Sequence, residues 1–160
     1  PEEAVRSSID TKYVGVPSMK VYAAPTDASA VITEYGYTES VSILARRAGC
    51  VEVRTMDGSG WAKAAELIDG KTAQDILDHP TPKFLTPPVA IPDPRAHGLI
   101  AMVASVNTDG DVVSAWKLAD STHSPKLIEA NLAALRQAKF YPIVQKGQRL
   151  TFTYEYDVTY

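Results

Sequence analysis

The distribution of proline constrains this chain more than any other feature of its sequence. Six of the 11 prolines fall within residues 80–94, whereas the others are scattered. Proline removes a backbone donor and disfavours helix at the preceding residue, so this stretch is expected to be extended. Residues 78–95 are either a semi-rigid spacer or an ordered loop across a neighbouring domain. We therefore predict one domain at 1–70, a proline-rich linker at 71–95 and a second domain at 96–160.

Composition narrows the classes of protein. The 160 residues are 45% hydrophobic and 22% charged, as in globular domains, and provide room for one ordinary domain or two small ones. A net charge of −3 argues against a nucleic-acid partner, and no apolar run approaches the ~20 residues of a spanning helix. Cys50 is the only cysteine, which excludes an internal disulfide, a thiolate zinc cage and an iron–sulfur cluster.

The N-terminal half consists of short apolar runs separated by turn residues. A glycine-rich turn at 57–60 follows one cleanly alternating run and is of the kind that hairpins use. Several short strands at close spacing indicate a small all-β barrel or sandwich. The predicted strands are 19–23, 31–33, 41–45 and 51–55, with further short runs at 61–63 and 67–68.

The run 51–67, with its glycine turn, its Gly60-Trp61 pair and its final Leu67, looks like the closing part of bacterial SH3-like (SH3b) domains. Residues 21–32 are similar to the opening strand and first loop of that family. The resemblance implies an SH3-like barrel that binds cell-wall peptide or protein in a groove. We assign that groove to Tyr22, Tyr35 and Trp61. From the residue type alone Trp61 is expected in the core, with a rim position as the alternative.

The C-terminal half has the order strand, strand, helix, strand. Asp109-Gly110 between the apolar runs 99–107 and 112–119 is a strong hairpin signal. Ser124-Pro125 provides a helix cap and a proline suited to the first helical position. The last strand, 150–158, alternates aromatic and polar residues. This order predicts an α+β domain in which one helix covers one face of a three-stranded antiparallel sheet.

That order resembles the TonB C-terminal domain family. The matching features are Gly98, Asp109-Gly110, Ser121, the helix 127–138, the run 139–142 ending in Pro142, and Lys146-Gly147. TonB-like domains receive a short segment of another protein by adding a strand, so the resemblance implies the same mode here. The last strand is long and free of proline, which also suits an open sheet edge. The predicted peptide-binding edge comprises Thr151, Thr153, Tyr154, Glu155 and Asp157. A homodimer through this edge, or its protection by the proline segment, is the alternative.

Side chains that could carry chemistry form no recognisable catalytic or metal pattern. His79, His97 and His123 lack the i, i+4 spacing of a helical metal site. Asp120, Ser121 and His123 lie close in sequence, but no nucleophile-elbow sequence surrounds the serine. We interpret them as a polar loop and predict no enzyme, no cofactor and no metal.

Cys50 and the short cationic run beside it allow two interpretations. The cysteine is either a reactive thiol, activated by Arg46 and Arg47, or a small buried apolar group in a strand. The buried group is the more frequent of the two for a single cysteine in a strand, and the sequence leaves the role of Cys50 open; the two arginines are expected at a solvated hairpin tip.

Together these features predict a periplasmic interaction protein of a Gram-negative cell envelope. Its TonB-like module would grip an extended segment of a protein partner, and its SH3b-like module would bind peptidoglycan stem peptide or a protein. Residues 1–5 carry no initiator methionine or leader pattern, so any lipid anchor would lie outside this chain. The alternative is a periplasmic inhibitor or immunity-type protein that blocks an enzyme or toxin; a cell-wall hydrolase ranks third.

Overall fold

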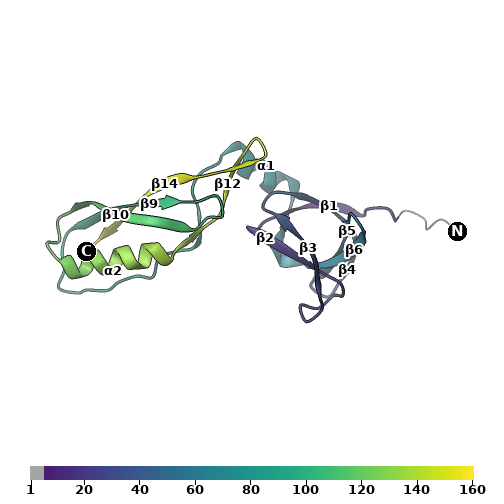
Figure 1. Cartoon of the computed structure of the whole chain (residues 1–160), viewed down its shortest axis with the longest axis horizontal. Coiled ribbons are helices and arrows are strands. Elements are labelled where there is room, and N and C mark those ends of the chain that lie inside the picture. Colours follow the sequence, from purple (N-terminus) through teal and green to yellow (C-terminus); the bar gives the residue numbers. More distant parts are fainter. Residues whose placement is uncertain (1–5) are drawn as a thin grey trace. The chain divides into compact units, whose positions relative to one another are not determined.

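The computed structural model describes residues 6–160, which form two compact units (Figure 1). The first unit ends at His79 and the second runs from Pro80 to Tyr160. Each unit has its own cluster of buried apolar side chains. Residues 1–5, on which the interpretation of the N-terminus rests, lie outside the described residues. Within residues 6–160 no helix has the length and apolar character that a bilayer crossing requires.

The first unit is built from one antiparallel sheet of seven strands, which curls round on itself in Figure 1. The strand order is β3-β2-β6-β5-β4-β1-β7. The predicted strands are present, whereas β1 was not predicted from the sequence. The core comprises Val14, Met19, Val21, Val41, Ile43, Val51, Val53 and Ala62. The elements are β1 (Asp10–Val14), β2 (Ser18–Tyr22), β3 (Val31–Gly36), β4 (Ser40–Arg47), β5 (Cys50–Thr55), β6 (Gly58–Lys63), a 3-10 turn (Ala64–Glu66) and β7 (Leu67–Ile68).

The glycine-rich segment 57–60 does not form the turn as predicted, because β6 already begins at Gly58. Thr55 pairs with Gly58, so the turn residues are Met56 and Asp57. Gly60 lies inside the sheet, where an added Cβ would come within 2.5 Å of a Val21 methyl carbon. Glycine at this position therefore permits close packing of neighbouring strands rather than a turn.

Helix α1 (Gly70–Asp78) completes the first unit and corrects the predicted linker at 71–95. Asp69 caps the helix, since its carboxylate accepts a hydrogen bond from the Thr72 amide at 2.7 Å. Ala73 on this helix is buried. The segment that the sequence predicts to connect two domains is instead divided between them, with the boundary between His79 and Pro80.

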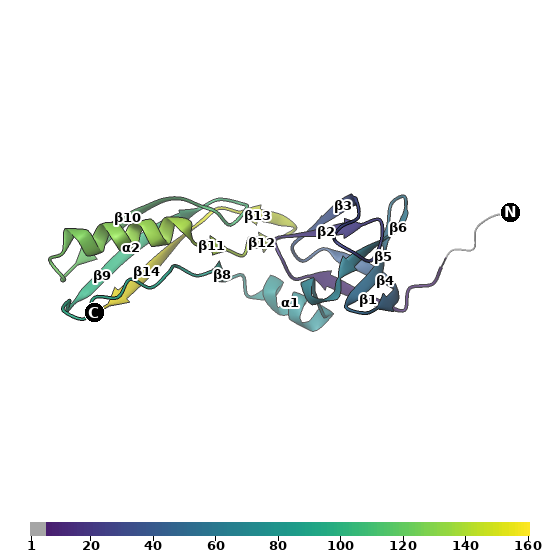
Figure 2. The same ribbon diagram turned by 90° about the horizontal axis from the view of Figure 1, so that it is seen from below.

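The second unit contains the predicted strand–strand–helix–strand order. Strands β9 (Leu99–Val106), β10 (Val112–Asp120) and β14 (Phe152–Thr159) form an antiparallel sheet of order β10-β9-β14. Helix α2 (Pro125–Gln137) packs on β10 and β9 and lies along one face of the sheet (Figures 1 and 2). Ser124 caps this helix, because its hydroxyl oxygen accepts a hydrogen bond from the Leu127 amide at 3.2 Å.

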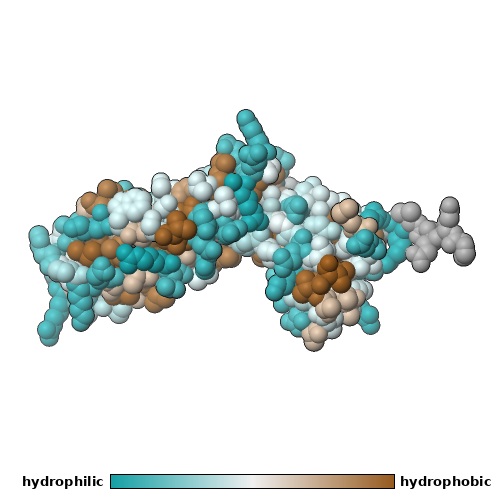
Figure 3. Space-filling view, viewed as in Figure 1, coloured by the Kyte–Doolittle hydropathy of each residue, from teal (hydrophilic) through white to brown (hydrophobic). Residues whose placement is uncertain are grey.

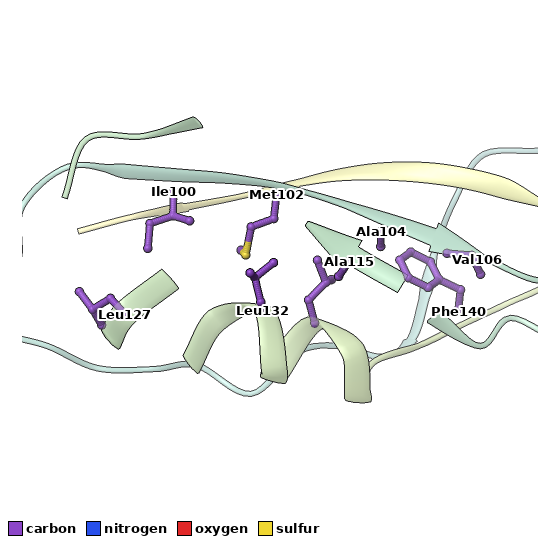
Figure 4. Close-up of a cluster of buried hydrophobic side chains, with 9 residues drawn as sticks. Ile100, Met102, Ala104, Val106, Ala115, Leu127, Leu132 and Phe140 are labelled. Atoms are coloured by element: carbon purple, nitrogen blue, oxygen red, sulfur yellow. The ribbon is translucent and has the colours of Figure 1, made fainter. Parts of the chain in front are cut away.

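The core of this unit lies between α2 and β9. Figure 4 shows side chains of β9 pointing toward the helix, where Leu127 and Leu132 meet them. Phe140, just beyond the helix, closes one end of the same cluster. The alternation of buried residues along β9 explains why the apolar run 99–107 forms a strand with one face toward the helix. The residues contributed by β9 are Ile100, Met102, Ala104 and Val106.

Residues 80–97, here called the proline tract, pack on this second core as an ordered segment. Strand β8 (Phe84–Thr86) pairs with β11 (Lys139–Phe140). The Phe84 ring centroid lies 4.5 Å from that of Phe140, 5.3 Å from that of Tyr154 and 5.7 Å from that of Tyr156. Ile91 packs against the same cluster. The sequence left open a semi-rigid spacer or an ordered loop across a neighbouring domain. The structure contains an ordered segment, which packs on the unit to which it belongs.

The predicted last strand, 150–158, is two strands. Strand β12 (Ile143–Gln145) pairs with β13 (Gln148–Leu150) through a tight turn at Lys146 and Gly147, both with positive φ. Thr151 follows β13, and β14 begins only at Phe152. Thr151 is therefore not part of the strand that borders the sheet.

Candidate functional site

Strand β14 is at the border of its sheet, and its register shows which backbone groups face outward. Tyr160 and Gly98 exchange two backbone hydrogen bonds, at 2.7 and 3.1 Å, which makes them a hydrogen-bonded antiparallel pair. The register continues without a shift from Thr159–Leu99 to Phe152–Val106. Because such pairs alternate, even-numbered residues of β14 turn their N–H and C=O groups toward β9. The outward set, here called the β14 edge, is Thr153, Glu155, Asp157 and Thr159.

Hydrogen bonds on the other side of β9 agree with this assignment. The Leu99 carbonyl accepts a hydrogen bond from the Ser121 amide at 2.9 Å, and the Leu99 amide donates to the Ser121 hydroxyl at 2.8 Å. Leu99 thus directs its backbone toward β10, as the alternation requires for odd-numbered residues of β9. Among residues 6–160, β9 is the only strand paired with β14.

Side chains on β14 follow the same alternation. The even-numbered residues are half-buried against the core, and the odd-numbered ones are exposed. Neither Glu155 nor Asp157 has an ion-pair partner within the described part of the chain. The β14 edge therefore combines unsatisfied backbone donors and acceptors with two unpaired carboxylates.

The sequence-predicted edge residues separate into two groups. Thr153, Glu155 and Asp157 lie on the β14 edge, whereas Tyr154 directs its backbone to β9 and its ring to the core, 5.4 Å from Phe140. Thr151 lies outside the strand. Sequence reasoning did not name Thr159, although extending the two-residue alternation beyond Asp157 reaches it.

The proline tract covers a face of β14 without pairing with its edge. Phe84 contacts the rings of Tyr154 and Tyr156, and the Tyr160 hydroxyl donates to the Ile91 carbonyl at 2.7 Å. Both contacts use even-numbered residues of β14 or its extension, whose side chains point to the core. The tract therefore covers the core-facing side chains of β14 and leaves its outward N–H and C=O groups unpaired among the described residues.

Asn131 joins this arrangement to helix α2 and is the buried polar side chain of the described residues, with 5% exposed. Its amide nitrogen donates to the Leu127 carbonyl and to the Tyr160 hydroxyl, each at 2.9 Å. One phenol thus connects the helix, the end of the sheet and the proline tract. Burial makes these bonds costly to break, because each polar partner would be left unsatisfied.

A second candidate site is an aromatic pocket of about 220 Å³ in the first unit. Tyr22 and Trp61 are paired across β2 and β6 and line it together. The Cys50 thiol lies 3.8 Å from the Pro25 carbonyl oxygen in the same pocket. An ion pair between Lys63 and Asp27, at 3.6 Å, is also part of its lining.

The residue type alone led us to expect Trp61 in the core, and that expectation is wrong. Gly60 and Ala62, its neighbours on β6, are buried, so the alternation of a strand turns Trp61 to the opposite face. Its half-buried ring forms a wall of the pocket, which is the alternative rim position.

Tyr35 is placed apart from the other two predicted groove residues. It lines a separate hollow of about 560 Å³ with Ile32 and Met56, and its hydroxyl donates to the Arg54 carbonyl at 3.3 Å. Burial raises the pKa of this phenol, and the nearby charge of Glu39 adds to the effect. The predicted groove is thus two sites, one with Tyr22 and Trp61 and the other with Tyr35.

In Figure 3, hydrophobic surface lies over β3, where Val31 and Ile32 are exposed.

The loop of Asp120, Ser121 and His123 is a structural turn. The Asp120 carboxylate accepts hydrogen bonds from the Thr122 hydroxyl and amide, at 2.6 and 2.9 Å, and from the His123 amide at 3.2 Å. Ser121 accepts from the Leu99 amide. The Thr122 hydroxyl and amide lower the pKa of Asp120. Asp120, Ser121 and His123 thus take part in the hydrogen bonds of the loop that connects β10 to α2.

The other histidines lie on the surface. His79 forms a contact of 3.2 Å with Asp75 at the end of α1, and His97 is exposed. Within residues 6–160 no group of three or more His, Cys, Asp or Glu side chains could hold a metal ion. Comparison of the chain with protein-family models, curated proteins and solved structures found no match.

Proposed function

We propose that this chain is an interaction protein of the bacterial cell envelope, whose second unit binds an extended segment of another protein as an added strand beside β14. The observation that carries the proposal is the row of outward N–H and C=O groups on Thr153, Glu155 and Asp157. An open edge of this kind gives affinity through main-chain hydrogen bonds, while alternate side chains give selectivity.

Two sequence resemblances support the cellular setting. The second unit has the element order of TonB C-terminal domains, which add a strand from a partner, and the first resembles SH3b domains. On this proposal the pocket between Tyr22 and Trp61 takes a cell-wall stem peptide or a protein segment. The protein acts in the periplasm, through binding rather than catalysis and without a cofactor.

Replacing Thr153 with proline tests the strand addition. The Thr153 amide points away from β9, so proline removes a donor from the open edge and leaves the β9–β14 hydrogen bonds in place. Thr153→Val is the matched control, because it keeps the amide and a β-branched side chain. We expect an envelope protein retained by the wild-type chain and by Thr153→Val to be lost from Thr153→Pro. Undiminished retention by a folded Thr153→Pro protein would contradict the proposed edge.

Sedimentation with purified peptidoglycan tests the first unit. Trp61→Ala removes a wall of the pocket and is expected to lower the bound fraction. Tyr35→Ala, which lies outside that pocket, serves as the control. Equal binding by Trp61→Ala and the wild type would exclude the pocket as the cell-wall site.

A further inference from the structure

The side chains of the β14 edge present a regular charge pattern. Glu155 and Asp157 are two residues apart on one strand, so they share a face and are separated by about 7 Å. Across the sheet they lie opposite Val103 and Ala101, which carry no charge. Their carboxylates are therefore available to a chain that approaches from the open side.

An added strand would place its own side chains directly opposite this pattern. Residues facing each other on adjacent antiparallel strands have Cβ atoms about 5 Å apart, close enough for opposite charges to attract and for like charges to repel. The positions opposite Glu155 and Asp157 are also two residues apart on the incoming strand. A segment with Lys or Arg at both positions would neutralise both carboxylates while its backbone pairs with the edge.

A second copy of this chain fits the same edge poorly. Antiparallel self-pairing must bring odd-numbered residues opposite odd-numbered residues, because these carry the outward backbone groups. The two registers with the greatest overlap of β14 then place Glu155 opposite Glu155, or Glu155 opposite Asp157. Each arrangement opposes like charges, which disfavours the homodimer considered from the sequence.

We infer that the β14 edge selects an extended segment with Lys or Arg at alternate positions and rejects a second copy of this chain. The inference rests on the proposed function, since it names the partner chemistry of the same edge. The backbone provides general affinity, and the two carboxylates determine which segment is bound and in which register.

Three synthetic peptides with blocked ends test this selectivity against the full chain by isothermal titration calorimetry. The first alternates lysine with valine, the second has glutamate in place of every lysine, and the third has the first composition with its lysines in adjacent pairs. The expected result is that the alternating lysine peptide binds roughly tenfold or more tightly than the glutamate peptide, because two attractive pairs replace two repulsive ones. The adjacent-lysine peptide should bind more weakly than the alternating one.

Reversing one charge provides the second measurement. Glu155→Lys should weaken binding of the lysine peptide and strengthen binding of the glutamate peptide. In the register that pairs residues 155 and 157, the introduced lysine would face Asp157 of a second copy, so analytical ultracentrifugation should detect concentration-dependent dimers. Glu155→Gln, which removes a charge without reversing it, should show neither the reversed preference nor the dimer. A monomeric Glu155→Lys protein with unchanged peptide preference would overturn the inference.

The outcomes separate this inference from the proposed function. Equal affinity for the lysine and glutamate peptides, with both lost in Thr153→Pro, would overturn charge selection and leave strand addition intact. Equal affinity for the alternating and adjacent-lysine peptides would overturn the requirement for alternate positions. Absence of binding by all three peptides would overturn the inference together with strand addition to this edge.

Discussion

Gly110, in the turn between β9 and β10, contacts the backbone of Phe140, which follows α2. Its φ of +87° is a conformation that other residues rarely adopt, and an added Cβ would lie 2.0 Å from the Phe140 carbonyl oxygen. The Phe140 amide donates to the Gly110 carbonyl at 2.8 Å. Gly110 therefore joins the β9–β10 hairpin to the segment that leaves α2, in addition to its place in the turn.

Gly110→Ala should lower the free energy of unfolding by about 2 kcal/mol or more, since it combines backbone strain with a clash against fixed backbone. Gly147→Ala is the matched control, because Gly147 has a φ of +76° but no atom within 4 Å of an added Cβ. Only the backbone strain of the left-handed conformation, about 1 kcal/mol, applies there. Urea unfolding curves of both variants measure the difference, and equal losses would exclude the clash.

Asp120 predicts a dependence of stability on pH. Hydrogen bonds from the Thr122 hydroxyl and amide lower its pKa in the folded state. A lowered pKa means that the stabilisation is complete above the unfolded value of about 3.9 and is lost as the pH falls through the folded-state pKa. Asp120→Asn should therefore lose less stability than the wild type between pH 6 and pH 3. Chemical unfolding at pH 6 and pH 3 measures the loss in the free energy of unfolding for each protein. Identical losses in the wild type and Asp120→Asn would contradict a stabilising role of the Asp120 carboxylate.

At the scale of elements, the alternation along β14 has a direct spectroscopic consequence. Amides of Tyr154, Tyr156 and Val158 point to β9 and should exchange slowly with deuterium. Amides of Glu155 and Asp157 point outward and should exchange much faster. Residue-resolved hydrogen exchange by NMR distinguishes the two sets. Uniform protection along β14 would show that the edge is already paired in solution.

Elements encoded by adjacent residues were predicted well, and those defined by distant partners were not. The Ser124-Pro125 helix start and the Asp109-Gly110 hairpin are local signals, and both are present in the structure. Strand β8 has only three residues, and its partner β11 follows α2, so nothing near it in sequence indicates the pairing. The prolines around β8 predict extended backbone but not the surface on which it packs.

The candidate sites show the same division. Periodicity along 150–158 identified the edge strand and most of its outward residues. Trp61 was expected in the core from its residue type alone, whereas the alternation along β6 buries Gly60 and Ala62 and turns Trp61 to the opposite face. Tyr22 and Tyr35 were both assigned to a groove by resemblance, whereas the β2–β3 register places Tyr35 opposite the buried Met19 and the two tyrosines line different hollows.

At the scale of the whole molecule, the boundary between the units predicts which fragments fold. A chain of residues 80–160 keeps the proline tract and should unfold cooperatively in urea. A chain of residues 96–160, the domain predicted from the sequence, lacks Phe84 and Ile91. Both side chains are partly buried against the core, and loss of their contacts should make the shorter fragment markedly less stable. Equal unfolding midpoints would show that the tract contributes little to this core.

The hydroxyl of Tyr160, shared by Asn131 and Ile91, also fixes the longitudinal position of β14. A slip of one residue would bring Glu155 and Asp157 inward and expose the aromatic rings to water. A slip of two residues would preserve the faces but carry the phenol away from both of its partners. Every molecule therefore presents threonine, glutamate, aspartate and threonine at the same fixed positions along the edge. An incoming strand shifted along β14 would place its charged residues opposite the wrong side chains.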